Sequence, residues 1–293
     1  MKKLLLLCAL LISVITLSGA ANRSFRTEME QWNPIGFTQA QSGPQTTNRL
    51  TAGSAIPPTV ATAAPSGVLR DGSTNVITFT TAKADGEKIW LCMEYSGATP
   101  TLSGATGTPK SGEWITYTLT SQTVTIRGDV TVLHCKGNQL TTLDVSKNTA
   151  LRELYCHYNQ LTTLDISKNL WKLDCYKNQL TTLDVSKNTA LANLDCSFNQ
   201  LTTLDLSKKS DLWRLDCSNN QLTTLNVSQN TALTGLYCYK NQLTTLDVSE
   251  NTALTTLNCS YNQLKALDVS NNTALTTLSC GTNQLTEIGR AHV

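Results

Sequence analysis

Residues 178–191 read NQLTTLDVSKNTAL, and close copies of this stretch fill the second half of the 293-residue chain. The copies are 21 residues apart, except for one interval of 19 in which the usual Thr-Ala after Asn169 is missing. A fixed period of this length predicts a solenoid, in which each repeat forms one coil that packs on its neighbours. Every copy begins with the letters NQL, at Asn138, Asn159, Asn178, Asn199, Asn220, Asn241, Asn262 and Asn283.

One complete repeat, residues 233–253, reads LTGLYCYKNQLTTLDVSENTA and contains two similar halves. In each half, apolar and polar residues alternate as they do in a β-strand. We therefore expect Leu236 and Cys238 to point inward, and Tyr237 and Tyr239 to point outward. The fold class expected is mainly β: a solenoid of about eight 21-residue coils with parallel stacked strands, and a second extended segment in each coil. The asparagine after each strand is expected to be buried at a bend, where its amide can satisfy unpaired backbone groups.

The first half of the repeat, Leu233-x-x-Leu236-x-Cys238-x-x-Asn241-x-Leu243, resembles the leucine-rich-repeat core with Cys in the place of the third leucine. The short nested repeat is similar to the bacterial leucine-rich repeats of secreted and surface proteins of Bacteroidetes-type bacteria, and more loosely to the internalins. This resemblance covers about residues 130–288 and implies a fold rather than one ligand. Internalins have a proline in the second half of a longer repeat, which is absent here, so internalin-type receptor binding is not implied.

The N-terminus has the composition of a cleaved signal peptide, residues 1–20. A positively charged start is followed by the apolar residues 4–17 and by Ser18-Gly19-Ala20 as a cleavage site. A membrane anchor is the alternative, but this apolar core is only 14 residues long, shorter than the roughly 18 to 20 residues that a spanning helix needs. We expect a secreted or cell-surface protein with no transmembrane span in the mature chain.

Three other segments flank the repeats. Residues 21–65 contain many Pro, Ala, Thr and Ser and predict a flexible linker. Residues 66–129 contain β-branched and aromatic runs between Gly- and Pro-rich turns, which predict a small β cap unit of three to five strands that ends near Arg127 and covers the first coil. Residues 289–293 break the repeat pattern and form an atypical tail, as a truncated reading frame or a cloning-derived end would produce.

Composition argues against several classes of function. A net charge of +2, spread along the chain, predicts neither a nucleic-acid partner nor an electrostatic membrane surface. The three histidines, His134, His157 and His292, form no recognisable catalytic or zinc pattern, and no phosphate-binding or dinucleotide motif occurs. We therefore expect no enzyme, no cofactor and no metal site.

Two ladders of chemically reactive side chains have a structural interpretation. Eight of the ten cysteines fall at one fixed place of the repeat. Neighbouring strands hold such side chains about 4.8 Å apart, which is wider than a disulfide prefers, so we expect reduced thiols that fill the core.

The acids of the second half, such as Asp144 and Asp184, could form a calcium column, but lysines follow several of them. A solvated face partly neutralised by lysine is the favoured interpretation.

The outward positions of the first half change from coil to coil, while the inward letters hardly change. Exposed aromatic and charged side chains on a rigid sheet suit recognition, because aromatic residues contribute much of the energy of most interfaces. The alternative is drift at positions that the core does not restrain. The candidate ligand-binding face consists of His134, Lys136, Tyr155, His157, Tyr158, Asp174, Tyr176, Asp195, Phe198, Asp216, Tyr237, Tyr239 and Tyr261.

The favoured hypothesis is a non-enzymatic protein that binds a protein or glycan, host-derived ligands included, through this variable face. Adhesion or host interaction would follow. A solenoid face has no deep pocket, which disfavours a small molecule. The alternative function is a structural spacer of the cell surface without a specific ligand.

Overall fold

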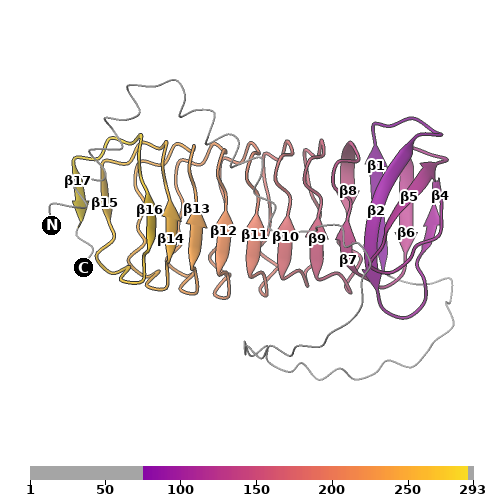
Figure 1. Cartoon of the computed structure of the whole chain (residues 1–293), viewed down its shortest axis with the longest axis horizontal. Helices are drawn as coiled ribbons and strands as arrows, with labels where there is room; N and C mark the ends of the chain where they lie inside the picture. Colours follow the sequence, from indigo (N-terminus) through magenta and orange to yellow (C-terminus); the bar gives the residue numbers. More distant parts are fainter. Residues whose placement is uncertain (1–74, 290–293) are drawn as a thin grey trace, which may run out of the picture. The chain divides into compact units, whose positions relative to one another are not determined.

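The computed structural model describes residues 75–289. The expected signal peptide and linker lie outside this range, as do residues 66–74 of the expected cap unit and residues 290–293 of the expected tail. All of the regular elements in the described part are β-strands, and most belong to one long sheet (Figure 1).

Six strands precede the repeats, one more than the upper limit expected from the sequence. Four of them coincide with β-branched and aromatic runs, whereas β3 and β4 have three and two residues and no such signal. The last of the six ends at Arg127, where the cap unit was expected to end. The strands are β1 (Val76–Thr81), β2 (Lys88–Tyr95), β3 (Thr101–Ser103), β4 (Ala105–Thr106), β5 (Trp114–Leu119) and β6 (Thr123–Arg127).

The repeats supply the other strands. Each first half forms a short strand in a parallel ladder, whereas only three second halves, those of β8, β15 and β17, form strands in the described residues. The strands are β7 (Val130–His134), β8 (Leu140–Asp144), β9 (Glu153–Tyr155), β10 (Lys172–Asp174), β11 (Asn193–Asp195), β12 (Arg214–Asp216), β13 (Gly235–Tyr237), β14 (Thr256–Asn258), β15 (Ala266–Asp268), β16 (Thr277–Ser279) and β17 (Glu287–Gly289).

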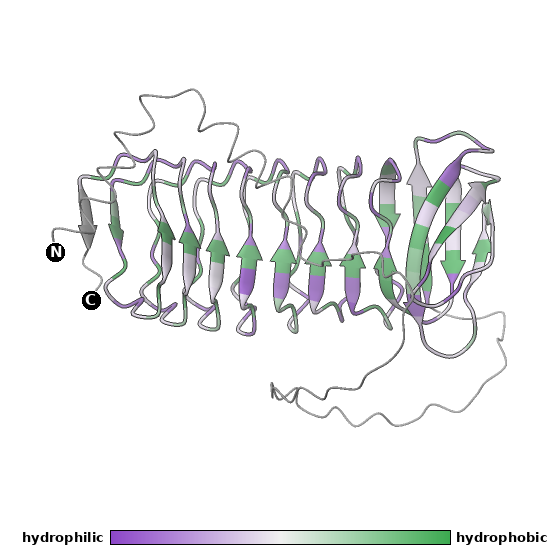
Figure 2. Ribbon diagram, in the orientation of Figure 1, coloured by the Kyte–Doolittle hydropathy of each residue, from purple (hydrophilic) through white to green (hydrophobic). Residues whose placement is uncertain are grey.

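The parallel register places equivalent residues of successive coils side by side. Leu173 of β10 aligns with Leu154 of β9 and with Leu194 of β11, as the repeat predicts. Hydrophobic bands therefore recur at the same level of successive strands (Figure 2). The alternation predicted within one repeat is confirmed: Leu236 and Cys238 are fully buried, while Tyr237 and Tyr239 are partly exposed.

The strands before the repeats continue the same structure. β2 pairs antiparallel with β7, so the long sheet runs on through β2, β5 and β4. β1 pairs antiparallel with β8, on the second half of the first coil, in a separate four-stranded sheet. Both halves of the first coil thus have hydrogen-bonded partners on the side that faces the cap strands, which removes the open edges that invite aggregation.

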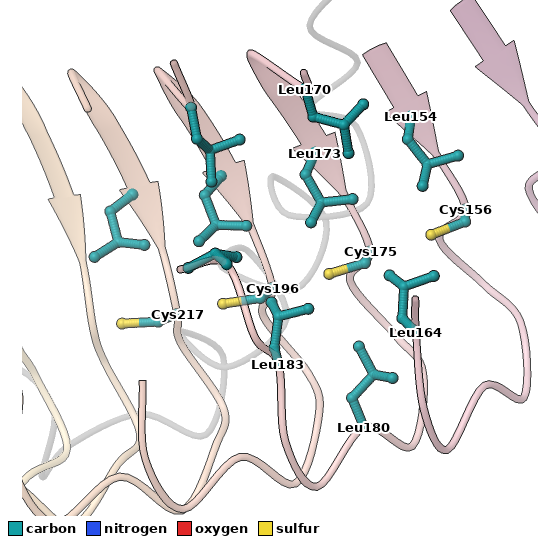
Figure 3. Packing of buried hydrophobic residues seen from close by; sticks show 14 of the residues in the cluster. Leu154, Cys156, Leu164, Leu170, Leu173, Cys175, Leu180, Leu183, Cys196 and Cys217 are labelled. Atoms are coloured by element: carbon teal, nitrogen blue, oxygen red, sulfur yellow. The ribbon is translucent and has the colours of Figure 1, made fainter. Parts of the chain in front are cut away.

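The core is a stack of leucines and cysteines. Leu154, Leu173, Cys156 and Cys175 have no exposed surface, and each type forms its own row along the solenoid (Figure 3). Burial of one leucine contributes roughly 1.5 to 3 kcal/mol, so several leucines per coil offset much of the entropy cost of ordering it. No disulfide joins the nine cysteines of residues 75–289.

The buried thiols should be unreactive until the protein unfolds. Burial raises the pKa of Cys135 to about 12, so little of the reactive thiolate forms near neutral pH. We expect iodoacetamide to leave Cys135 and Cys175 unmodified in the native protein and to alkylate both in urea without reductant, as peptide mass spectrometry would measure. A disulfide-linked pair of repeat peptides would contradict this expectation.

The asparagine after each strand is buried and joins two coils, as the sequence predicts. The Nδ2 atom of Asn199 donates to the carbonyl oxygens of Cys196 (3.0 Å) and Cys175 (3.1 Å), one in its own coil and one in the preceding coil. Its Oδ1 atom accepts a hydrogen bond from the backbone nitrogen of Leu180 at 3.0 Å. Asn178 and Asn220 make equivalent bonds. These side chains satisfy backbone groups at a bend where no strand partner is available.

The residue before this asparagine has left-handed backbone geometry in each of these coils. Its φ angle lies between 52° and 56° at Tyr158, Lys177, Phe198 and Lys240, among others. Side chains other than Gly and Asn pay roughly 1–2 kcal/mol for this geometry. Only the first coil has a glycine here, Gly137. The bonds of the asparagine therefore hold a strained bend whose own residue type is not constrained.

A second ladder of buried polar residues supports the other half of the coil. Asn251 donates from Nδ2 to the carbonyl oxygens of Val227 and Asn230, at 3.0 and 2.8 Å. In the coil that is two residues shorter, Ser167 occupies the equivalent place and its Oγ atom donates to the carbonyl oxygen of Asn148 at 2.6 Å. The missing residues are thus accommodated without breaking the ladder.

Replacing one ladder asparagine should destabilise the protein strongly. Asn199→Ala leaves the buried backbone nitrogen of Leu180 without its partner. It also removes one of two amide donors from the carbonyl oxygens of Cys175 and Cys196, which keep Asn178 and Asn220. Since an unsatisfied buried group costs roughly 1–3 kcal/mol and a lost hydrogen bond about 1 kcal/mol, we expect a loss of about 3 kcal/mol in urea denaturation. Gln200→Ala, at an exposed neighbouring position, should change the stability by less than about 0.5 kcal/mol. Equal effects of the two substitutions would show that the amide is dispensable.

Candidate functional site: the outer strand face

The outward side of the long sheet, which we call the strand face, contains the predicted binding residues in three rows. The first row follows the inner leucine of each strand, and its members align directly through the strand register. All of its members are partly exposed. The first row consists of His134, Tyr155, Asp174, Asp195, Asp216 and Tyr237.

The second row follows the cysteine of each coil, and the third follows one residue later, at the left-handed bend. Backbone hydrogen bonds such as Tyr158 N to Tyr176 O, at 3.1 Å, hold the bends of adjacent coils together. Of the predicted residues, the second row contains Lys136, His157, Tyr176 and Tyr239. The third contains Tyr158, Phe198 and Tyr261. Tyr158 and Tyr261 are more exposed than the tryptophans of the repeats, and Phe198 is slightly less exposed than they are.

Two histidine–tyrosine stacks form the first part of the strand face. The rings of His134 and Tyr155 are 4.0 Å apart and nearly parallel, and those of His157 and Tyr176 are 4.5 Å apart. The expectation that His157 is exposed is wrong: only 8% of it is accessible. The stacking ring of Tyr176 belongs to the next coil. Burial, with a contribution from Lys136, lowers the pKa of both imidazoles to about 4, so they are neutral at physiological pH.

Lysines of neighbouring coils lie over the aromatic rings of the third row. The Nζ atom of Lys177 is 4.4 Å from the ring centre of Tyr158 and 5.5 Å from that of Phe198. Lys240 lies 5.8 Å from the ring centre of Tyr261. Cation–π attraction of this kind is worth about 0.5–1 kcal/mol at exposed sites, enough to orient the rings while they remain accessible.

Three stacked carboxylates, Asp174, Asp195 and Asp216, form the middle of the first row. Burial, followed by the charge of Asp195, raises the pKa of both Asp174 and Asp216 to about 7. Burial also raises the pKa of Asp195, although hydrogen bonds from Ser197 oppose the shift. The strand face therefore holds an acidic centre with tyrosines at either end, and its charge is sensitive to pH near neutrality.

The sequence did not identify the residues that begin each strand on this face. The Nζ atom of Lys172 lies 4.8 Å from the ring centre of Tyr155, and Cζ of Arg214 lies 4.5 Å from that of Tyr237. Both cations lower the pKa of Asp174 against the effect of burial. The alternating pattern could have located them, because they lie two residues before the predicted row.

The strand face also extends beyond the repeats. Trp114 of β5 has its ring centre 5.6 Å from that of His134 and 5.4 Å from the Nζ atom of Lys136. Its indole is 48% exposed. The aromatic surface thus continues onto the cap strands, because β2 and β5 belong to the same sheet as the repeats.

The second-half acids make turns. The backbone nitrogen of Ser186 donates to Oδ1 of Asp184 at 2.8 Å, and Ser249 donates likewise to Asp247. Such side-chain-to-backbone bonds are typical of Asx turns, and hydrogen bonds from Ser186 lower the pKa of Asp184. Within residues 75–289, no cluster of three or more His, Cys, Asp or Glu residues has a metal-binding arrangement.

No helix in the described range has the length and hydropathy required to cross a membrane.

Comparison with known proteins identifies the repeat. Residues 252–291 match the family model described as Leucine Rich repeats (2 copies). The functional domain of InlJ from Listeria monocytogenes is 37% identical, with 58% of this chain and 44% of that chain covered and a TM-score of 0.53. An internalin, InlF, from L. monocytogenes strain 4b F2365 is 29% identical (49% and 45% covered, TM-score 0.44). YopM from Yersinia enterocolitica WA-314 is 27% identical (50% and 32% covered, TM-score 0.42). No curated protein matches.

The described chain is a solenoid of 21-residue coils that is similar to bacterial leucine-rich-repeat proteins of the internalin type. It spans less than half the length of each of the three solved chains. The InlJ domain includes a cysteine ladder, and a buried row of cysteines occurs at one fixed place of each coil here. Solenoids of this type are typically protein-binding scaffolds and not enzymes.

Removing the central carboxylate should stabilise the protein above neutral pH. The folded-state pKa values of Asp174 and Asp216 lie above the ordinary value of 3.8, so ionisation costs stability as the pH rises from about 4 through 7. Asp195→Asn relieves the repulsion and keeps an acceptor for Ser197. We expect its melting temperature to exceed that of the wild type by a few degrees at pH 8, or about 1–2 kcal/mol, and by less at pH 5.

Asp184→Asn is the matched control, because its carboxylate has a lowered pKa in an exposed turn. It should give no rise in melting temperature at pH 8. A destabilised Asp195→Asn variant at pH 8 would contradict the assignment of strain to the acidic centre.

Proposed function

We propose that this chain is a non-enzymatic secreted or cell-surface protein that binds a protein or glycan through the strand face. The observation that supports this most directly is the contrast between the two sides of each strand. The inward positions are Leu and Cys in every coil. The outward positions change along the solenoid, from aromatic side chains in the first coils to carboxylates in the middle coils and tyrosine again at Tyr237.

The chemistry of the strand face supports a macromolecular ligand. Tyr155, Tyr176 and Tyr237 are partly exposed and are held by stacked rings or by cations. Tyrosines held in this way lose little conformational entropy on binding, and such residues are frequent interface anchors. The binding surface spans several coils, which suits an extended contact with a protein or glycan better than a small molecule.

The internalin-like repeat supports binding without naming a ligand. Adhesion or interaction with a host molecule agrees with the signal-like N-terminus and with the bacterial relatives. A ligand on the bacterial cell surface would bind to the same strand face. A screen of the purified mature chain on glycan and host-protein arrays would identify the class of ligand.

Substitution on the strand face tests the proposal once a ligand is found. We expect the triple variant Tyr155→Ala, Tyr176→Ala, Tyr237→Ala to weaken binding at least 30-fold, because one interface anchor alone contributes about 2 kcal/mol. Isothermal calorimetry would measure this. Circular dichroism melting should show that the variant still unfolds cooperatively.

The matched control replaces exposed lysines of the second-half turns, Lys147, Lys187 and Lys208, with alanine. These changes should leave the affinity unchanged. Wild-type affinity in the tyrosine variant would refute the strand face as the binding site. The absence of any ligand on the arrays would favour a spacer role instead.

A further inference from the structure

We propose that Trp171 and Trp213 form a second binding site, at the N-terminal ends of strands β10 and β12. Its ligand would be an extended β-1,4-linked polysaccharide without net charge. Neither residue belongs to the three rows of the strand face. The site therefore goes beyond the proposed function and can be tested separately.

The two tryptophans occupy the same place in coils that are two steps apart. The backbone nitrogen of Ala192 donates to the carbonyl oxygen of Trp171 at 2.8 Å, and that of Trp213 donates to the carbonyl oxygen of Ala192 at 2.9 Å. These bonds form a column immediately before the strands labelled in Figure 1. Since adjacent strands lie about 4.8 Å apart, the two tryptophan backbones are about 10 Å apart.

The scaffold has no need of tryptophan at this place. In later coils the position holds Thr234, Thr255 and Thr276, whose hydroxyl groups donate to the carbonyl oxygen of the preceding coil at 3.0–3.1 Å. A tryptophan has no hydroxyl group on Cβ with which to make this bond. Trp171 and Trp213 instead remain 39% and 43% exposed. These two coils therefore present an apolar surface at a position where threonine is sufficient for the fold in other coils.

The residue between the tryptophans keeps the site open. Ala192 is the smallest side chain in this column, and it separates the two indoles by one complete coil. A ligand that follows the solenoid axis can therefore contact Trp171, pass over Ala192 and contact Trp213. A larger side chain at Ala192 would obstruct this path.

A pyranose chain has the chemistry to match. The apolar face of a sugar ring packs on an indole, which offers a large apolar surface and a polarised π system. The spacing of the tryptophans is comparable to one disaccharide unit of an extended β-1,4-linked chain, so alternate sugars would meet them. Arg152 precedes Trp171 in the same column, and Asp211 lies two residues before Trp213. Charged groups of both signs near the site offer hydrogen-bond partners for hydroxyl groups and favour a neutral ligand.

Affinity electrophoresis tests this site directly. The probes are hydroxyethylcellulose and glycol chitin, cast separately into native gels, with cellohexaose and chitohexaose as soluble ligands for calorimetry. We expect at least one polymer to retard the wild-type protein. Trp171→Ala and Trp213→Ala should each weaken binding at least tenfold. Ala192→Glu should have the same effect while both indoles remain, a result that loss of a packing contact would not produce.

Two controls make the result decisive. Trp90→Ala removes a somewhat more exposed tryptophan, 48% accessible, from the cap strands and should leave retardation unchanged. The triple tyrosine variant of the strand face should also bind the polymer normally, so that failure of this proposal and of the proposed function can be distinguished. No retardation of the wild type by either polymer, or equal retardation of the wild type and both tryptophan variants, would overturn the proposal.

Discussion

The side-chain amide of the asparagine after each strand is the interaction on which this solenoid depends. A strand of three residues cannot turn the chain and also satisfy every backbone group at the bend. The amide of Asn199 does so by bonding Cys196 in its own coil and Cys175 and Leu180 in the coil before. Because the side chain bridges two coils, each bend also fixes the distance and register of the next one. The leucine rows can then pack without gaps.

This arrangement separates the residues that stabilise the fold from those on the strand face. The inward leucines, cysteines and asparagines meet the demands of the fold, so the outward side chains are free to vary. They include an unfavourable feature, the stacked carboxylates of Asp174 and its neighbours, which a purely structural surface would replace with neutral residues. The rigidity supplied by the core allows such like-charged groups to stay in register.

Repetition explains which features could be predicted from the sequence. The inward letters recur at a fixed interval, so the alignment of Leu154 with Leu173 and the three outward rows followed from the pattern. The pairing of β2 with β7 did not, because it joins segments without a shared repeat. Nor did the burial of His157, which depends on a tyrosine of the next coil across the one shortened interval. The left-handed bend at Tyr158 carries no glycine signal, and its geometry comes from the neighbouring asparagine.

The shortened coil has an evolutionary consequence. Ser167 replaces an asparagine of the second ladder and bonds Asn148, while the strands on either side keep their alignment. Insertions and deletions in the second half of a coil are therefore absorbed away from the strand face. A gene built in this way can gain or lose whole repeats by recombination, and the protein then lengthens or shortens its strand face by about 4.8 Å at a time. New outward side chains can be added with new coils, while the existing coils keep their sequence.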